Sequence, residues 1–134
     1  MLEIPEDRKD LLAWETKAIA YLALSLKDGP QVTPIWFDWD GTHIILNTAR
    51  GRVKDRVMRK HGRVALAIPD PSDFYRYLQI RGTVVDETEE GGYEQICKLN
   101  EKYHGKYEFA LPPGQVRVTY RILPESVFPR ASKT

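Results

Sequence analysis

The feature that most constrains the fold is a series of short apolar runs separated by turn signals. Six runs of seven to thirteen residues show the alternation or the β-branched content typical of strands. They cover residues 18–27, 31–39, 42–48, 64–70, 77–87 and 116–128. Six antiparallel strands of this length would leave exposed edges as an open sheet, so we expect a closed or nearly closed barrel.

Three other segments show helical signals. Residues 5–18 open with proline and acids and then place leucines near helical spacing, which favours a short N-terminal helix. Residues 52–62 predict a three-turn helix that ends at Gly62, and residues 89–106 predict a longer amphipathic helix with Cys97 on its apolar face. The fold class predicted from the sequence is therefore mainly β with accessory α-helices.

Length and composition exclude several classes of protein. The 134 residues, 42% of them hydrophobic, suffice for one domain over residues 1–134. Twenty basic residues against nineteen acidic ones give a formal charge of +1, so we expect neither a nucleic-acid nor a membrane partner. The N-terminal residues do not resemble a signal peptide and no run is long enough to span a membrane, which favours a cytoplasmic location.

Metal and cysteine chemistry are also not expected. Cys97 is the single cysteine, so neither an internal disulfide nor a cysteine-based zinc site can form. The three histidines are scattered, without other metal-binding side chains at ligand spacing. We therefore predict no metal, and Cys97 is interpreted as a packing residue.

The strongest local signal is the basic segment 50–63, whose seven cations and one acid give a local charge of about +6. It follows a strand, passes through Gly51 and opens a helix, where free backbone N–H groups and the helix dipole favour an anion. This pattern predicts a phosphate site. The alternatives are a solvated helix face and a DNA-reading helix, although no preceding helix completes a helix-turn-helix.

Aromatic residues near strand ends offer a surface for a planar ring. Trp36, Trp39, Tyr75 and Tyr77 could stack against such a ring or pack in the core. The motifs of serine hydrolases, P-loop NTPases and Rossmann dinucleotide-binding proteins do not occur. An organic cofactor held by the barrel fits the remaining signals.

Residues 32–85, from VTPIWFDWDGTHIILNTARGRVKD through LQIRGTVV, resemble the pyridoxamine phosphate oxidase-like split-barrel superfamily, and most closely its small branch of F420-dependent oxidoreductases. The likeness continues through KYHGK and the last strand VRVTYRILPESV. The resemblance implies a six-stranded antiparallel Greek-key split β-barrel. It also implies a homodimer with two cofactors in grooves at the subunit interface.

The resemblance assigns residues to each part of the cofactor. The ring is expected against Pro34, Ile35 and Trp36, with Asn47 and Thr48 at the strand end beside it. The residues expected at the cofactor phosphate are Arg52 and Lys54, with Arg50 and Arg56 as further contacts. The residues expected to approach from the partner subunit are Tyr75, Tyr77 and Gln79.

The function implied is that of an oxidoreductase that transfers a hydride between a bound deazaflavin, F420, and an unsaturated organic substrate. The alternatives are an FMN-binding oxidoreductase of the same fold and a non-catalytic module that binds a flavin or haem. Basic residues beyond the first turn of the helix favour F420, whose anionic tail extends past the phosphate. No side chain is assigned as catalytic. The C-terminal PESVFPRASKT lacks the basic segment of true pyridoxamine phosphate oxidases, so vitamin B6 oxidation is not expected.

Overall fold

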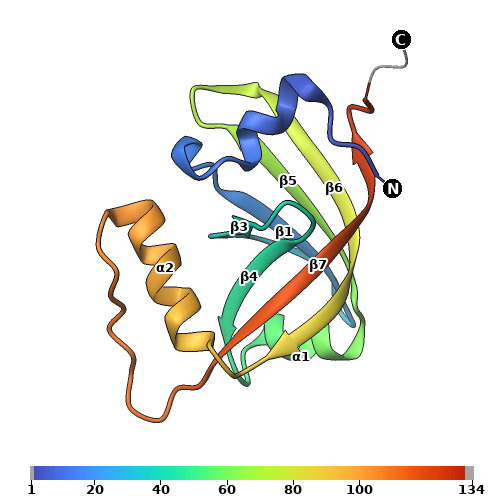
Figure 1. The fold of residues 1–134 in the computed structure, drawn as a ribbon. Coiled ribbons are helices and arrows are strands. Elements are labelled where there is room, and N and C mark those ends of the chain that lie inside the picture. The colour runs from blue at the N-terminus through green and yellow to red at the C-terminus, as the bar shows by residue number, and fades with distance from the viewer. Residues whose placement is uncertain (1, 132–134) are drawn as a thin grey trace.

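The computed structural model describes residues 2–131, which form one antiparallel sheet of seven strands in the order β2-β1-β5-β6-β7-β4-β3. The strands are β1 (Ala20–Leu26), β2 (Gly29–Ile35), β3 (Asp38–Trp39), β4 (Ile44–Ala49), β5 (Arg63–Asp70), β6 (Asp73–Thr88) and β7 (Arg117–Phe128). The helices are the 3₁₀ turns η1 (Glu6–Leu12) and η2 (Trp14–Thr16), and α1 (Val53–Lys60) and α2 (Gly92–His104). The sheet curls into a barrel with η1 across one end, α1 at the other and α2 outside, so the mainly β split-barrel prediction is confirmed (Figure 1).

The barrel interior holds the hydrophobic core. Alternate residues of β1 point inward, and Leu22 and Leu24 are buried there. All six residues of β4 are buried, because one face of this strand meets the core and α2 packs near its other face. Covering both faces removes the usual alternation of apolar and polar residues along the strand.

The sheet has seven strands where six were predicted, because the run 31–39 is interrupted at Trp36 and Phe37. Two side chains of α2 bind the Phe37 backbone. The hydroxyl of Tyr103 accepts from Phe37 N at 3.3 Å, and Lys102 Nζ donates to Phe37 O at 2.7 Å. These backbone groups are therefore occupied by a helix instead of a neighbouring strand, and β3 begins afresh at Asp38.

The helices differ from the predictions at their ends. The N-terminal segment forms two 3₁₀ helices. Asp10 O accepts from Ala13 N at 3.1 Å and from Thr16 Oγ1 at 2.5 Å, and these bonds end the first of the two helices. Helix α1 has eight residues instead of three turns, and its C-cap is His61 in an extended conformation. Gly62 lies between this cap and β5, and its carbonyl accepts from Val84 N at 2.7 Å.

Helix α2 agrees with the prediction. It spans Gly92–His104 and ends at Gly105, which adopts the left-handed conformation (φ 82°) that favours glycine. Cys97 is buried on its inner face, as expected for a packing residue. Within residues 2–131, no helix has the length and apolar character needed to cross a membrane.

Candidate functional site

A groove of about 510 Å³ opens where the barrel, the start of α1 and α2 meet. Its volume lies in the range of small-molecule sites. It brings together seven of the residues predicted from the sequence: Pro34, Ile35, Trp36, Asn47, Thr48, Arg52 and Lys54. The residues that complete its lining are Ile19, Tyr21, Ile96, Phe109 and Arg117.

A rigid aromatic wall bounds the groove at Trp36. The indole stacks on the Tyr103 ring with centroids 5.2 Å apart and planes 18° apart, and its edge meets the His104 ring at 5.3 Å. Tyr103 is itself fixed, since its hydroxyl donates to Ala18 O at 2.6 Å. Burial raises the pKa of Tyr103 to about 12, so the hydroxyl remains a donor at neutral pH. The flat wall is therefore held in place before any ligand binds.

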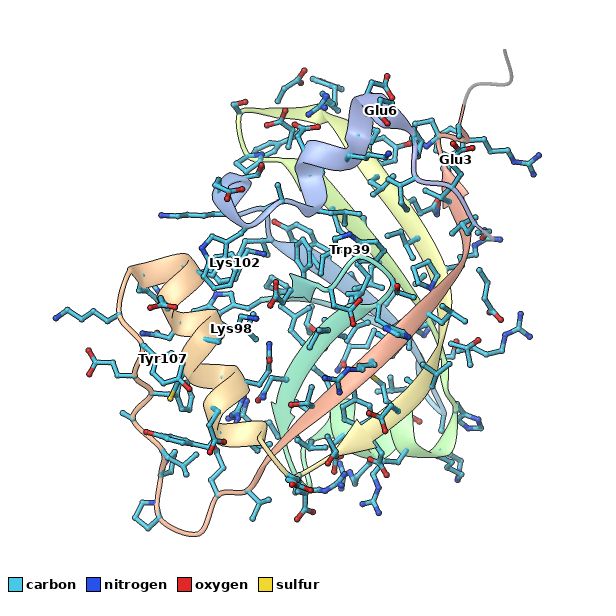
Figure 2. The ribbon with its side chains drawn as sticks, viewed as in Figure 1. Glu3, Glu6, Trp39, Lys98, Lys102 and Tyr107 are labelled. Carbon is cyan, nitrogen blue, oxygen red and sulfur yellow. The ribbon has the colours of Figure 1, made fainter. Side chains whose placement is uncertain are left out.

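Two lysines of α2 contact the adjoining segment at Phe37 and Asp38, and Figure 2 labels both, Lys98 and Lys102. Lys102 is fully buried, with its ammonium 4.1 Å from the centre of the Phe37 ring. Burial lowers the pKa of Lys102 to about 8, partly offset by the nearby charge of Asp38. The Asp38 carboxylate forms its ion pair with Lys98, at 3.3 Å. Lys102 is thus a buried cation without a paired carboxylate among the described residues.

Arg50, the first cation of the basic segment, is neutralised by carboxylates of the protein itself. Its guanidinium forms ion pairs with Asp55 at 2.8 Å, Glu87 at 2.8 Å and Glu89 at 2.7 Å. These hydrogen bonds hold the pKa of Arg50 above its ordinary value. Arg50 does not line the groove, so the structure does not bring it together with the predicted phosphate contacts.

Asp55 shapes the turn that presents the next cations. Its buried carboxylate accepts from Gly51 N at 2.9 Å and from the Tyr120 hydroxyl at 2.6 Å. Although burial acts in the opposite direction, these bonds and the one from Arg50 keep the pKa of Asp55 below its ordinary value. Gly51 has φ +90°, a conformation that favours glycine. The carboxylate therefore fixes the turn from which Arg52 and Lys54 reach the groove.

Three cations line the groove, and none forms an ion pair with a described residue: Arg52, Lys54 and Arg117. Burial and then the charge of Arg52 lower the pKa of Lys54. Arg117 is held by neutral amides, since its Nε donates to Asn47 Oδ1 at 2.9 Å. Asn47 in turn donates from Nδ2 to Gly92 O at 2.8 Å, so both ends of its carboxamide have internal partners.

Sequence reasoning missed Arg117. The alternation of Val116, Val118 and Tyr120 predicts the last strand but gives Arg117, which lies between them, no place in a site. In the structure, Arg117 is buried, with 7% of its surface exposed. The one signal in the sequence is a charge within an apolar strand that follows a long predicted helix.

The other predicted site residues lie outside this groove. Arg56 lines a second groove, of about 1010 Å³, beside α1, together with Lys27, Lys60 and Arg63. On β6, Tyr75 is 96% exposed, and the Tyr77 ring stacks with Phe128 at 6.2 Å. Gln79 lies near Phe128 in a shallow pocket. A single chain does not test their predicted approach from a partner subunit.

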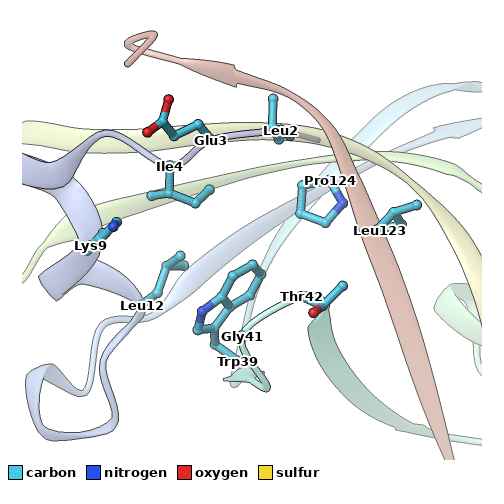
Figure 3. Close-up of a pocket in the computed structure, with 10 residues that line it drawn as sticks. All are labelled: Leu2, Glu3, Ile4, Lys9, Leu12, Trp39, Gly41, Thr42, Leu123 and Pro124. Atoms are coloured by element: carbon cyan, nitrogen blue, oxygen red, sulfur yellow. The ribbon is translucent and has the colours of Figure 1, made fainter. Parts of the chain in front are cut away.

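A third pocket, of about 350 Å³, has a different character (Figure 3). Its apolar lining residues are Leu2, Ile4, Leu12, Trp39, Leu123 and Pro124. Trp39, one of the aromatic residues considered for ring stacking, therefore faces this pocket and does not line the groove. The ammonium at its rim, Lys9 Nζ, is paired with Glu6 at 2.7 Å. The pocket offers no free cation among its described residues, so it does not suit an anionic ligand.

The groove combines features that suit a planar molecule with an anionic arm. The Trp36 wall offers a flat apolar surface, while Arg52, Lys54 and Arg117 supply unpaired positive charge. A buried cation held only by amides, as Arg117 is, gains a counter-ion when an anion binds. The residues present therefore fit a flavin or deazaflavin with its phosphate.

Comparison with known proteins agrees with this geometry. A solved structure of a protein named F420 Reductase is 33% identical, covers 92% of this chain and 98% of its own, and has a TM-score of 0.80. The protein Rv2991 from Mycobacterium tuberculosis (20% identity, 99% and 94% coverage, TM-score 0.70) and HupZ from Group A Streptococcus (21%, 98% and 100%, 0.64) share the fold. The curated proteins yield no significant match.

The family profile described as Pyridoxamine 5'-phosphate oxidase matches residues 8–130, nearly the whole chain. This match covers every strand of the barrel and both elements that bring cations to the groove. The chain therefore belongs to the pyridoxamine 5'-phosphate oxidase family of split β-barrels.

Proposed function

We propose that this protein is an oxidoreductase that binds an F420-type deazaflavin in the groove and transfers a hydride between it and an unsaturated organic substrate. The observation that carries the proposal is the placement of a fixed aromatic wall beside three cations without counter-ions. The likeness to a solved F420 reductase over almost the whole chain supports the same class of cofactor.

The bound cofactor would supply the hydride chemistry, and the protein would supply position and electrostatics. Arg52 and Lys54 would bind the phosphate through charge-assisted hydrogen bonds. Trp36 would bound the ring site, fixed by its stacking on Tyr103. Because the wall and the turn at Gly51 are already fixed by internal contacts, little ordering is required when the ligand binds.

The groove beside α1 favours a deazaflavin over FMN. Lys27, Arg56, Lys60 and Arg63 line it and form no ion pair with a described residue. The deazaflavin has carboxylates beyond its phosphate, and these require positive charge at a distance from the ring. FMN remains the second candidate, because both cofactors carry a phosphate that Arg52 and Lys54 would bind.

We also propose that the protein is a cytoplasmic homodimer that closes the groove across its interface. Phe74 (76% exposed), Tyr75 (96%) and Phe128 (55%) are large apolar side chains open to solvent on one chain. Exposed apolar side chains of this kind are typical of interaction surfaces. In a twofold dimer, the partner's Tyr75, Tyr77 and Gln79 would approach the cofactor. Sedimentation of the protein as a monomer at micromolar concentration would contradict this arrangement.

A competitive titration tests the choice of cofactor. Apo protein is titrated with F420 and with FMN at low and at high salt, and the variant Arg56→Gln with Lys60→Gln is compared with the wild type. We expect tighter binding of F420, a steeper loss of its affinity with salt, and a loss in the double variant that FMN does not share. Tighter binding of FMN at both salt concentrations would refute the preference for the deazaflavin.

A second measurement separates an enzyme from a binding module. The protein-bound cofactor is reduced, and its absorbance is followed as unsaturated acceptors are added. Reoxidation at a rate above that of free cofactor supports the proposed oxidoreductase. Tight binding without faster reoxidation for any acceptor would favour the non-catalytic alternative.

A further inference from the structure

Arg117 is a cation whose surroundings lack a counter-ion among the described residues. Its side chain is 7% exposed at the first position of β7. Nε donates to Asn47 Oδ1 at 2.9 Å and Nη1 donates to Gln115 Oε1 at 3.0 Å, and both acceptors are neutral amides. The Phe109 ring lies 5.0 Å from the guanidinium carbon. These contacts fix the direction of the guanidinium without neutralising it.

The third nitrogen of Arg117, Nη2, donates to no described residue. Because Nη2 has no partner and is not a fully buried atom, it remains accessible from outside the protein. Arg117 lines the groove, which is the open space beside its side chain. An unused donor on a rigidly held guanidinium is thus available to a ligand there.

Arg117 also lies close to the predicted phosphate contacts. Its backbone is paired with Ala49, the last residue of β4 before the turn into α1. The charge of Arg52 is near enough to contribute to lowering the pKa of Arg117, which burial chiefly brings to about 10. Two like charges are therefore held together in one groove, an arrangement that an anion between them would relieve.

Arg50 provides a contrast within the same region. It is surrounded by three carboxylates, from Asp55, Glu87 and Glu89. The fold therefore can neutralise an arginine at this end of the barrel, and at Arg117 it does not. Uncompensated charge of this kind is typical of sites that bind an oppositely charged ligand.

We infer that Arg117 is a third anion-binding residue of the groove, which donates from Nη2 to an oxyanion beside Arg52. The inference deepens the proposed function, on which it rests for the identity of the ligand. With three cations, the groove favours an anionic ligand over a neutral ligand of the same shape. The oxyanion is a phosphate of the cofactor or a carboxylate of the acceptor, and both are bound by the same guanidinium geometry.

A matched pair of ligands and a matched control variant test this role. FMN and riboflavin differ only in the phosphate, and their binding is followed by quenching of flavin fluorescence. We expect Arg117→Gln to weaken FMN by about tenfold or more and to leave riboflavin unchanged, with Arg117→Lys intermediate. Arg121→Gln is the control, because Arg121 lies on the same strand but is paired with Asp86 at 3.2 Å.

Two further measurements identify which ligand carries the oxyanion. One of them remains informative if the proposed function is wrong. If FMN and F420 affinities are unchanged but the KM for a carboxylate acceptor rises in Arg117→Gln, the oxyanion belongs to the acceptor. Calorimetry with inorganic pyrophosphate on apo protein needs no flavin, so a loss there supports Arg117 even if no cofactor binds. The inference is overturned if folded Arg117→Gln retains its affinity for FMN, F420 and pyrophosphate together with an unchanged KM.

Discussion

Replacing Lys102 by methionine should change how the stability of the protein depends on pH. The ammonium is fully buried, and its pKa is lowered from 10.5 to about 8, chiefly by burial. The protonated side chain therefore destabilises the folded state by about 3 kcal/mol at pH values below both pKa values. As pH rises through the folded pKa, the folded chain releases this proton while the unfolded chain keeps it, so stability increases with pH.

The magnitude can be measured between neutral pH and the ordinary pKa of lysine. Between about pH 7 and pH 9.5, the Lys102 contribution to the free energy of unfolding should rise by roughly 2 kcal/mol. Urea unfolding of the wild type and of Lys102→Met across this range gives the difference curve, in which other titrating groups cancel. Lys98→Met is the control, because Lys98 is half exposed and paired with Asp38. A difference curve that stays flat would refute the picture of a buried, uncompensated ammonium.

Three other variants test separate parts of the structure. Arg52→Ala with Lys54→Ala should weaken cofactor binding by about 2 to 4 kcal/mol in a titration, because both remove unpaired charge from the groove, and unchanged affinity in a folded variant would exclude their role. Cys97→Ala should leave turnover unchanged and lower the free energy of unfolding by about 1 kcal/mol, whereas complete loss of activity in a stable protein would mean that the thiol takes part in the chemistry. Gly82→Ala should destabilise by about 2 kcal/mol in urea unfolding, since its Cβ would lie 2.6 Å from Leu123 O; a stability equal to the wild type would show that the two strands can separate there without loss.

The strand pattern was sufficient to predict the barrel, because alternation and turn signals are local properties of the chain. The interruption at Phe37 could not be predicted in this way. It depends on Lys102 and Tyr103, which lie 65 and 66 residues further along the sequence. Only the packing of α2 against the barrel brings these side chains to the Phe37 backbone.

In the candidate site, too, some residues could be predicted from the local sequence, whereas others depend on contacts with distant parts of the chain. Arg52 and Lys54 were predicted from their position at the start of a helix, and the structure places both in the groove. Arg50 looked equivalent in the sequence, but Glu87, 37 residues later, is one of the carboxylates that neutralise it. Arg117 was not predicted as a site residue, because the alternation of a strand does not reveal whether a helix covers its outer face.

The contacts that form the groove also determine when a growing chain can bind a ligand. The hydrogen bonds from Lys102 to Phe37 and from Arg117 to Asn47 join residues 65 and 70 positions apart. The β1–β2 and β5–β6 hairpins need only neighbouring residues, so they can form first. During synthesis, these hairpins are therefore complete before the residues that finish the groove have been made. A ligand in the groove at Arg52 can therefore contact Arg117 only after residue 117 has emerged.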